Sequence, residues 1–226
     1  MAAPPDLPPI RDEEVIVHAG AVEVGGHLTV PVGASAVVVF AHGSGSSRHS
    51  PRNREVAAVL NQAGMATLLF DLLTPDEADD RANVFDIGLL GRRLRDVTEW
   101  LTTQPDVAHL PVGYFGASTG AAAALVAAAD PASTVTAVVS RGGRPDLAGP
   151  LLPSIRVPTL LIVGGADDVV LDLNRQAQER LRCQNRLVVV PGATHLFDEP
   201  GTLHVAAEAA RDWFLDHAVN VAPGGP

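Results

Sequence analysis

Residues 112–129 read VGYFGASTGAAAALVAAA, and the two halves of this stretch differ in character. The first half is a short apolar run with valine and aromatic residues, which is typical of a buried β-strand. The second half is rich in alanine, which favours a helix. Between them lies Gly116-Ala117-Ser118-Thr119-Gly120, a Gly-x-Ser-x-Gly pattern. Glycines on both sides of the serine remove side chains that would collide with neighbouring backbone in a sharp strand-to-helix turn.

Ser118 is therefore the candidate nucleophile of the chain. The predicted helix points its N-terminus at the serine, where its dipole stabilises negative charge. Because the chain is rich in glycine and serine, the alternative is a chance match, which matching partners downstream would exclude. The rival nucleophile is Cys183, the single cysteine, but it falls at the end of a predicted helix without a paired histidine motif and is interpreted as structural.

Apolar runs and segments of helical spacing alternate on both sides of this stretch. Two short strands, Val15–His18 and Val22–Val30, read as a hairpin that forms an antiparallel edge. The further predicted strands are Ala36–Ala41, Ala66–Asp71, Val112–Gly116, Thr136–Ser140, Thr159–Gly164 and Arg186–Val190. The predicted helices are Arg54–Ala63, Ile87–Thr102, Thr119–Ala129, Val170–Leu181 and Leu203–His217. This order predicts an α/β fold with a mostly parallel, doubly wound sheet and helices on both faces.

Ligands bind outside the carboxyl ends of the strands in such sheets, and two late strands end in chemically useful residues. The strand that begins at Thr159 leads to Asp167 and Asp168, and the last strand leads to His195. A triad needs a base and a carboxylate that holds its imidazole in the right tautomer. The predicted base is His195 and the predicted acid is Asp167, with Asp168 as the alternative acid or as the cap of the next helix.

A loop of small residues, His42-Gly43-Ser44-Gly45-Ser46-Ser47, follows the strand that ends at Ala41. Small residues let backbone N–H groups approach a ligand closely, which favours an oxyanion hole. The predicted donors are the N–H groups of Ser44 and of Thr119, with Gly43 or Gly45 possible in place of Ser44. A phosphate-binding loop is the alternative, but the Lys-Ser/Thr ending that it requires is missing.

Several basic residues also follow strand ends, namely Arg48, His49, Arg52, Arg141 and Arg144. We consider substrate binding by Gly43, Gly45, Arg48 and Arg141, with the two arginines holding an anion. The alternative is that these arginines form ion pairs with the acidic loop from Asp71 to Asp86. That loop lacks the spacing of a calcium site and is interpreted as a solvated surface, so no metal and no cofactor are predicted.

The composition excludes several classes of partner. A formal net charge of −10 argues against nucleic acid and anionic membrane surfaces, since both require a basic face. The segment Met1–Glu14 is proline-rich and charged, unlike a secretion signal, and the longest apolar run is too short to span a bilayer. Together with the single cysteine, these features predict a cytoplasmic protein with a small-molecule substrate, and they leave a homodimer open.

The chain divides into three predicted parts. Residues 1–13 form a proline-rich arm, residues 14–218 form one domain, and residues 219–226 form a flexible tail. The length suits a single domain, and no internal repeat is present.

With these motifs in view, the chain resembles the dienelactone hydrolase branch of the α/β-hydrolase superfamily, in its small members without a cap domain. The resemblance runs from Glu14 to His217 and rests on HGSG at 42–45, GASTG at 116–120, LIVG at 161–164 with Asp167, and GATH at 192–195. It implies an α/β-hydrolase fold and hydrolysis through Ser118, Asp167 and His195.

One departure from the family bears on the substrate. Enzymes that act on dienelactone use cysteine where Ser118 stands, so ordinary carboxylic esters are expected instead. The short gap between Ser140 and Thr159 leaves little room for a lid and predicts an open site for short acyl chains, small lactones or aryl esters. The alternatives are a non-catalytic binding protein, or thioesterase, amidase or perhydrolase chemistry on the same three residues.

Overall fold

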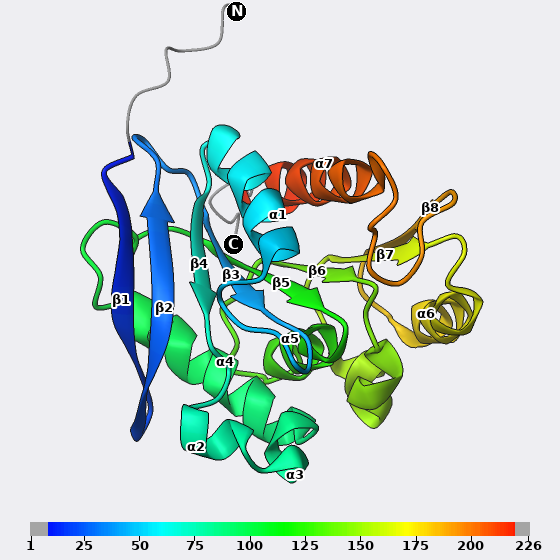
Figure 1. Cartoon of the computed structure of the whole chain (residues 1–226), viewed down its shortest axis with the longest axis horizontal. Helices are drawn as coiled ribbons and strands as arrows, with labels where there is room; N and C mark the ends of the chain where they lie inside the picture. The colour runs from blue at the N-terminus through cyan, green and yellow to red at the C-terminus, as the bar shows by residue number, and fades with distance from the viewer. Residues whose placement is uncertain (1–8, 220–226) are drawn as a thin grey trace, which may run out of the picture.

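The computed structural model describes residues 9–219, which form one eight-stranded sheet with helices on both faces (Figure 1). The strand order across the sheet is β1-β2-β4-β3-β5-β6-β7-β8. The strands are β1 (Arg11–Ala19), β2 (Val22–Val30), β3 (Val37–Ala41), β4 (Ala66–Phe70), β5 (Val112–Ala117), β6 (Ala137–Arg141), β7 (Thr159–Gly164) and β8 (Asn185–Val190).

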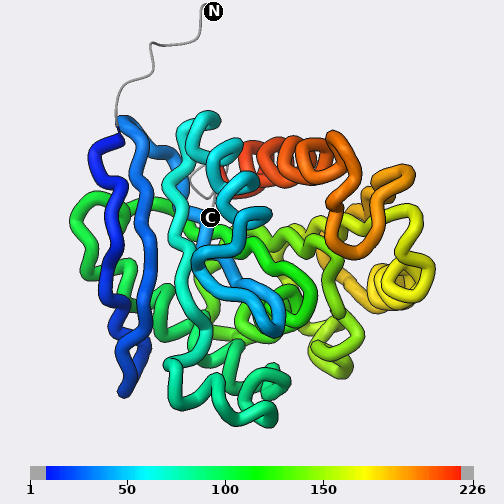
Figure 2. Tube along the Cα trace, viewed as in Figure 1, coloured from blue at the N-terminus to red at the C-terminus, as the bar shows by residue number. Residues whose placement is uncertain are grey.

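Strand direction confirms the predicted class. β1 pairs antiparallel with β2, and β2 pairs antiparallel with β4, whereas all later neighbours run parallel. The antiparallel pair lies at one edge of the sheet and β8 at the other (Figure 2). The carboxyl ends of the parallel strands therefore meet along one rim.

The helices form two layers. α1 (Pro51–Gln62) and α7 (Thr202–Phe214) pack side by side over one face, and α4 (Ile87–Leu101) and α5 (Thr119–Ala128) pack together over the other (Figure 1). α6 (Asp168–Arg180) packs on β7 and β8. The shorter helical segments are α2 (Pro75–Ala78), α3 (Arg81–Val84), the 3₁₀ segment η1 (Pro145–Ser154) and the π-helical turn η2 (Leu215–Val219).

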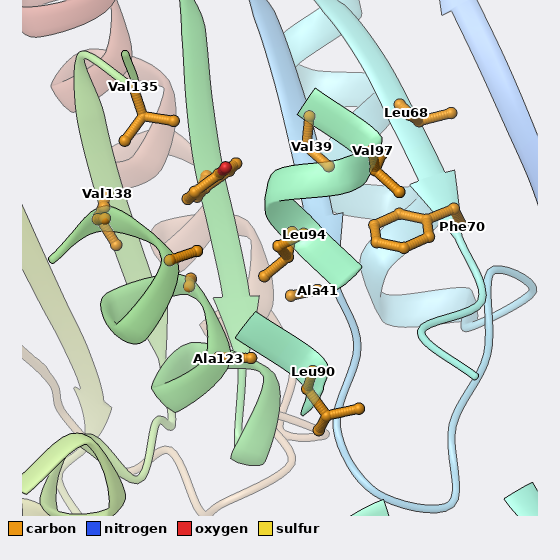
Figure 3. Packing of buried hydrophobic residues seen from close by; sticks show 14 of the residues in the cluster. Val39, Ala41, Leu68, Phe70, Leu90, Leu94, Val97, Ala123, Val135 and Val138 are labelled. Atoms are coloured by element: carbon orange, nitrogen blue, oxygen red, sulfur yellow. The ribbon is translucent and has the colours of Figure 1, made fainter. Parts of the chain in front are cut away.

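Two hydrophobic clusters, one on each face, hold the sheet in place. Alternate residues of β3 enter different clusters: Val39 faces α4 and α5, while Phe40 faces α1 and α7. Figure 3 shows the first cluster, where Val97 of α4 lies near Val39 and Phe70, and Leu94 of the same helix lies near Ala41. Because both faces of each central strand are buried, these strands read as continuous apolar runs instead of alternating ones.

The starts of β1 and α1 differ from the predictions. β1 begins at Arg11, so residues 11–13 belong to the sheet and not to the predicted arm. α1 begins at Pro51 because Ser50 caps it through a hydrogen bond from the Asn53 N–H and proline is favourable at a first helical position. Residues 1–8 and 220–226, which hold the rest of the predicted arm and nearly all of the predicted tail, lie outside the described residues.

The acidic segment, residues 71–86, contains α2 and α3, and its carboxylates Asp76, Asp79, Asp80 and Asp86 are exposed, as a solvated surface predicts. Thr74 and Glu77 form a capping box, in which each side chain accepts a hydrogen bond from the backbone N–H of the other residue. The Glu77 carboxylate also pairs with Arg93 of α4 at 2.8 Å, and these contacts lower its pKa against the opposing effect of burial. The helical pair is thereby fixed beside the rim of the sheet.

Candidate active site

Ser118 lies in the tight turn between β5 and α5. Its backbone has φ 52° and ψ −122°, a conformation that non-glycine residues rarely adopt. The two flanking glycines are required by close packing, since a Cβ on Gly120 would lie 2.1 Å from the Ala41 carbonyl oxygen and one on Gly116 would lie 2.4 Å from Ala121 Cα. The predicted nucleophile elbow is therefore present in the backbone geometry.

Hydrogen bonds hold this turn against the end of β6. The Ser118 N–H donates to the Arg141 carbonyl at 3.2 Å, and the Arg144 N–H donates to the Ser118 carbonyl at 3.1 Å. The strain of the elbow is thus supported by backbone contacts on both sides of the serine.

His195 and Asp167 meet at the same rim of the sheet. His195 Nδ1 lies 2.7 Å from Asp167 Oδ2, and the imidazole is 40% exposed while the carboxylate is 14% exposed. Gly164 allows the Asp167 loop and the His195 loop to approach each other, because a Cβ at this position would lie only 2.3 Å from the Ala193 carbonyl oxygen. Of the two carboxylates left open by the sequence, the structure brings Asp167 to the histidine.

Asp168 does not cap the following helix, because α6 begins at Asp168 itself and Asp167 occupies the N-cap position. The Asp167 side chain makes no capping hydrogen bond, since its carboxylate faces His195. The apolar spacing placed the start of this helix at Val170, whereas α6 begins two residues earlier, at Asp168.

The loop that carries His195 is anchored by Glu199. The Thr194 hydroxyl donates to Glu199 Oε1 at 2.6 Å and the Thr194 N–H donates to Oε2 at 3.0 Å. These hydrogen bonds, that of the hydroxyl first, lower the pKa of Glu199. Phe197, two residues after His195, is buried with a positive φ of 58°.

Ser118 and His195 line the same cavity, of about 240 Å³, which is named the triad cavity here. Within residues 9–219, no hydrogen bond joins the Ser118 hydroxyl to the imidazole. In free enzymes such bonds are often long and shorten only when substrate is bound. The arrangement thus brings a serine, a histidine and a carboxylate to the rim from three separate strand ends.

The predicted oxyanion donors are next to each other, but one is engaged. The Ser44 N–H donates to Thr119 Oγ1 at 2.9 Å. The Thr119 N–H is at the first position of α5 and has no acceptor within the helix. Gly43 packs against Ser118, since a Cβ on Gly43 would lie 3.0 Å from Ser118 Cβ.

His42 is a residue whose role the sequence did not reveal. Its Nε2 accepts a hydrogen bond from the Leu72 N–H at 3.1 Å, so Nδ1 carries the proton and donates to the Gly43 carbonyl at 2.9 Å. Burial lowers the pKa of His42, which keeps the ring neutral. The histidine therefore ties the Gly43–Ser46 loop to the segment after β4. Its place directly before a glycine at a strand end was the available signal.

Arg141 also lines the triad cavity, and its charge is unusual. The residue is 6% exposed, its Nε has no hydrogen-bond partner, and its guanidinium lies 5.5 Å from the centre of the Phe197 ring. Burial, and secondarily the charge of Arg52, lower the pKa of Arg141 to about 10, so it stays cationic at neutral pH. Within residues 9–219, no carboxylate pairs with it.

The other basic residues are already paired. Arg48 contacts Asp71 and Glu14, which matches the ion-pair alternative and not substrate binding. Arg48 does not line the triad cavity. Arg52 pairs with Asp198 at 3.0 Å at the edge of the triad cavity, and Arg144 pairs with Asp146 at 2.7 Å.

A second cavity, of about 290 Å³, lies on the other side of the Gly43–Ser46 loop and is named the apolar cavity here. Its lining includes Gly43, Gly45 and Thr119. Side chains from the α2–α3 segment and the start of α4 complete it, namely Leu72, Leu73, Pro75, Ala78, Val84 and Leu90. The sequence did not reveal this cavity because its lining comes from a segment that was read as solvated.

Cys183 is far from this chemistry in the fold, because its thiol contacts Thr159 at the start of β7, the end of the strand opposite to the Asp167 loop. Burial raises the pKa of this thiol, which fits the structural interpretation. In the part of the chain that the structure covers, no group of His, Cys, Asp or Glu is placed to hold a metal ion. None of the helices described there has the length and hydrophobicity needed to cross a membrane.

Comparison with known proteins agrees with this geometry. The model of the dienelactone hydrolase family matches residues 24–218. The crystal structure of a dienelactone hydrolase from Anabaena variabilis ATCC 29413 is similar, with 57% sequence identity and a TM-score of 0.88 over 92% of this chain and 98% of that chain. Est1E from Butyrivibrio proteoclasticus shares the fold at 15% identity, with a TM-score of 0.76 over 90% of this chain and 98% of that one.

A longer relative carries a different name. The "Putative phosphoribosyl transferase Rv0571c" of Mycobacterium tuberculosis (strain ATCC 25618 / H37Rv) is 68% identical over 218 residues, which are 96% of this chain and 49% of that protein. The chain thus spans about half the length of this relative. The family match and the similarity to the Anabaena structure both extend over most of the chain, and we conclude that it belongs to the dienelactone hydrolase family.

Proposed function

We propose that the chain is a serine hydrolase that cleaves carboxylic esters through an acyl-enzyme. Ser118 is the nucleophile, His195 the general base and Asp167 the acid that orients the histidine. The observation that carries the proposal is the contact of 2.7 Å between His195 Nδ1 and Asp167 Oδ2, beside a cavity that the elbow serine also lines.

The contacts suggest how each residue acts. With Asp167 ionised, His195 donates its Nδ1 proton to the carboxylate, and Nε2 is left to accept the proton of the Ser118 hydroxyl. Ser118 Oγ then bonds to the ester carbonyl carbon, and the carbonyl oxygen becomes an oxyanion. When this intermediate collapses, the bond to the alcohol oxygen breaks and His195 protonates that oxygen. Water, deprotonated by the same histidine, then releases the acid and restores Ser118.

The Thr119 N–H and an N–H of the Gly43–Ser46 loop are the proposed oxyanion donors. Thr119 has its amide at the N-terminus of α5, where the helix dipole also favours negative charge. Ser44 serves as the loop donor if the oxyanion replaces Thr119 Oγ1 as the acceptor of its N–H. Gly43 keeps the loop close to Ser118, and Gly45 lines the apolar cavity with a φ of 70°.

The alternatives lack an observation of their own. A non-catalytic binding protein would not need a strained serine or a carboxylate on the histidine. Thioester, amide and peroxy-acid chemistry would use the same residues, and a substrate panel separates them from ester hydrolysis. The transferase name belongs to a relative of which this chain matches half, so it assigns no activity to this half.

A fluorophosphonate probe tests the proposal directly, because it forms a covalent bond only with an activated serine. We expect labelling of the wild-type protein, none of Ser118→Ala, and wild-type labelling of Ser133→Ala, since Ser133 lies outside the triad cavity. Hydrolysis of 4-nitrophenyl acetate should fall by a factor of about 10⁴ or more in Ser118→Ala. An unlabelled wild-type protein, or equal labelling of Ser118→Ala, would refute the proposal.

A further inference from the structure

The triad cavity and the apolar cavity share one wall. Gly43, Ser44 and Ser46 line both of them. Ser118 and His195 face the triad cavity, whereas Thr119, the next residue after the nucleophile, faces the apolar cavity. The reacting centre therefore lies where the two cavities meet, and a substrate that reaches into both has one part in each.

The chemistry of ester cleavage decides which part of the substrate lies in which cavity. His195 has to protonate the oxygen of the departing alcohol, so the alcohol lies on the His195 side, in the triad cavity. The carbonyl oxygen has to face the N–H groups of Thr119 and the Gly43–Ser46 loop. The acyl chain then continues past these donors into the apolar cavity, which both of them line.

The apolar cavity suits a hydrocarbon chain. Leu72 and Leu90 are nearly fully buried at its wall, and the α2–α3 segment contributes Val84 and other aliphatic side chains. A volume of about 290 Å³ is at the small end of ligand pockets. A butanoyl or hexanoyl group fills such a space better than acetyl does, because more apolar surface is removed from water.

One of the two arginines that line the triad cavity has no carboxylate partner among residues 9–219. The cavity contains the guanidinium groups of Arg141 and Arg52, and Asp198 neutralises Arg52. Arg141 is 6% exposed as a residue, its Nε is buried without a hydrogen-bond partner, and it has no carboxylate partner within residues 9–219, so a bound anion would stabilise it. One unpaired guanidinium matches a single carboxylate, which an arginine binds through two parallel hydrogen bonds.

We infer that the substrates are esters of an apolar carboxylic acid with a hydroxy acid, whose carboxylate binds at Arg141. This inference rests on the proposed function and names the substrate class of that same site. Hydrolysis releases the hydroxy acid from the triad cavity first and leaves the apolar acyl group on Ser118.

The test uses esters of 4-nitrophenol and of 3-carboxy-4-nitrophenol, each as acetyl, butanoyl and hexanoyl ester, so that leaving-group charge and acyl length vary independently. For the wild-type protein, we expect kcat/KM to be roughly tenfold to hundredfold higher for the carboxylated leaving group at equal acyl length. We also expect butanoyl or hexanoyl esters to exceed acetyl esters in both series. Rates are corrected for the hydrolysis of each ester without protein.

Matched variants assign each preference to its cavity. Arg141→Met should reduce the carboxylate preference to near unity and Arg141→Lys should keep part of it. Because Arg141 is buried and its variants can unfold, Arg52→Gln is the second variant, expected to lower the preference severalfold. Arg54→Gln on the same helix is its control, since Arg54 lies outside the triad cavity. Val84→Trp should remove the preference for longer acyl groups, whereas Ala82→Trp, exposed on the same helix and outside the lining, should not.

The outcomes separate this inference from the proposed function. Fluorophosphonate labelling with equal rates for both leaving groups would refute the inference and leave the hydrolase intact. A carboxylate preference that persists in folded Arg141→Met, or a chain-length profile unchanged by Val84→Trp, would also refute it. Absence of labelling would refute the proposed function itself.

Discussion

Ser118 and Phe197 are the two non-glycine residues within 9–219 that have a positive φ. Each such conformation costs about 1–2 kcal/mol for an L-residue. Both residues line or border the triad cavity, Ser118 directly and Phe197 through the contact of its ring with Arg141. The strain in this backbone is therefore concentrated at the candidate active site, where packing of β6 and the His195 loop supports it.

Two adjacent carboxylates give a sharp test of which one serves the histidine. Asp167→Asn should lower kcat for 4-nitrophenyl butanoate by roughly 10³–10⁴-fold, because an amide favours the wrong imidazole tautomer. Asp168→Asn should change kcat by less than about twofold, since Asp168 only begins α6. Steady-state kinetics of both purified variants, with circular dichroism to verify folding, provides the measurement. Equal losses in the two variants would contradict the assignment of Asp167.

Between elements, His42 connects the end of β3 to the segment that follows β4. Its two ring nitrogens bond to the Gly43 carbonyl and the Leu72 N–H, so the wall shared by the two cavities is tied to the α2–α3 segment. The ring is buried and neutral, and a proton on Nε2 would remove the acceptor for the Leu72 N–H. The position of the loop should thus depend on pH.

This dependence has a definite sign. Burial lowers the pKa of His42 in the folded chain, so the unfolded chain, with an ordinary pKa of about 6.5, binds more protons in acid. The free energy of unfolding should fall as the pH drops below about 6.5 and should gain nothing from this residue at higher pH. His42→Asn should flatten this part of the profile, whereas the exposed His204→Asn should not. Urea denaturation from pH 5 to 8 measures it, and parallel profiles for wild type and His42→Asn would contradict the prediction.

Across the molecule, the two helical layers cover the sheet whose rim carries Ser118, Asp167 and His195. α7 follows the His195 loop directly and packs on α1 and on strands β6, β7 and β8. Its Phe214 is fully buried and lies over Gly113, where a Cβ would be 2.6 Å from the ring. Gly113 is near the start of β5, whereas Ser118 follows the other end of that strand. The Phe214 contact and the proposed chemistry are therefore at opposite ends of β5.

Phe214→Ala should separate stability from catalysis. Loss of the buried ring should lower the free energy of unfolding by about 3–5 kcal/mol. The kcat of the folded variant should stay within about twofold of wild type at temperatures well below its midpoint. Val205→Ala, on the same helix but 45% exposed, should change stability by less than about 0.5 kcal/mol. Thermal unfolding and initial rates measure both quantities, and a large loss of kcat in folded Phe214→Ala would refute this separation.

The fold class and the triad candidates were predictable from local patterns. Continuous apolar runs predicted the six strands β3 to β8, because strands buried on both faces cannot alternate in polarity, and a hairpin signal predicted β1 and β2. Glycines at 116 and 120 indicated close backbone approaches that the structure contains. The parallel order then placed Ser118, Asp167 and His195 at one rim, since parallel strands end on the same side.

The features that escaped prediction depend on contacts between distant segments. Most carboxylates of residues 71–86 are exposed, as their composition indicated, but Glu77 binds Arg93, and the aliphatic side chains of the same segment line a cavity. Arg48 and Arg141 looked alike in the sequence, but Arg48 found Asp71 and Glu14 while Arg141 was buried without a carboxylate. Local composition determines which backbone a segment adopts. Which charges are neutralised, and which space stays empty, depends on residues far away in the chain, and only the packed tertiary structure decides it.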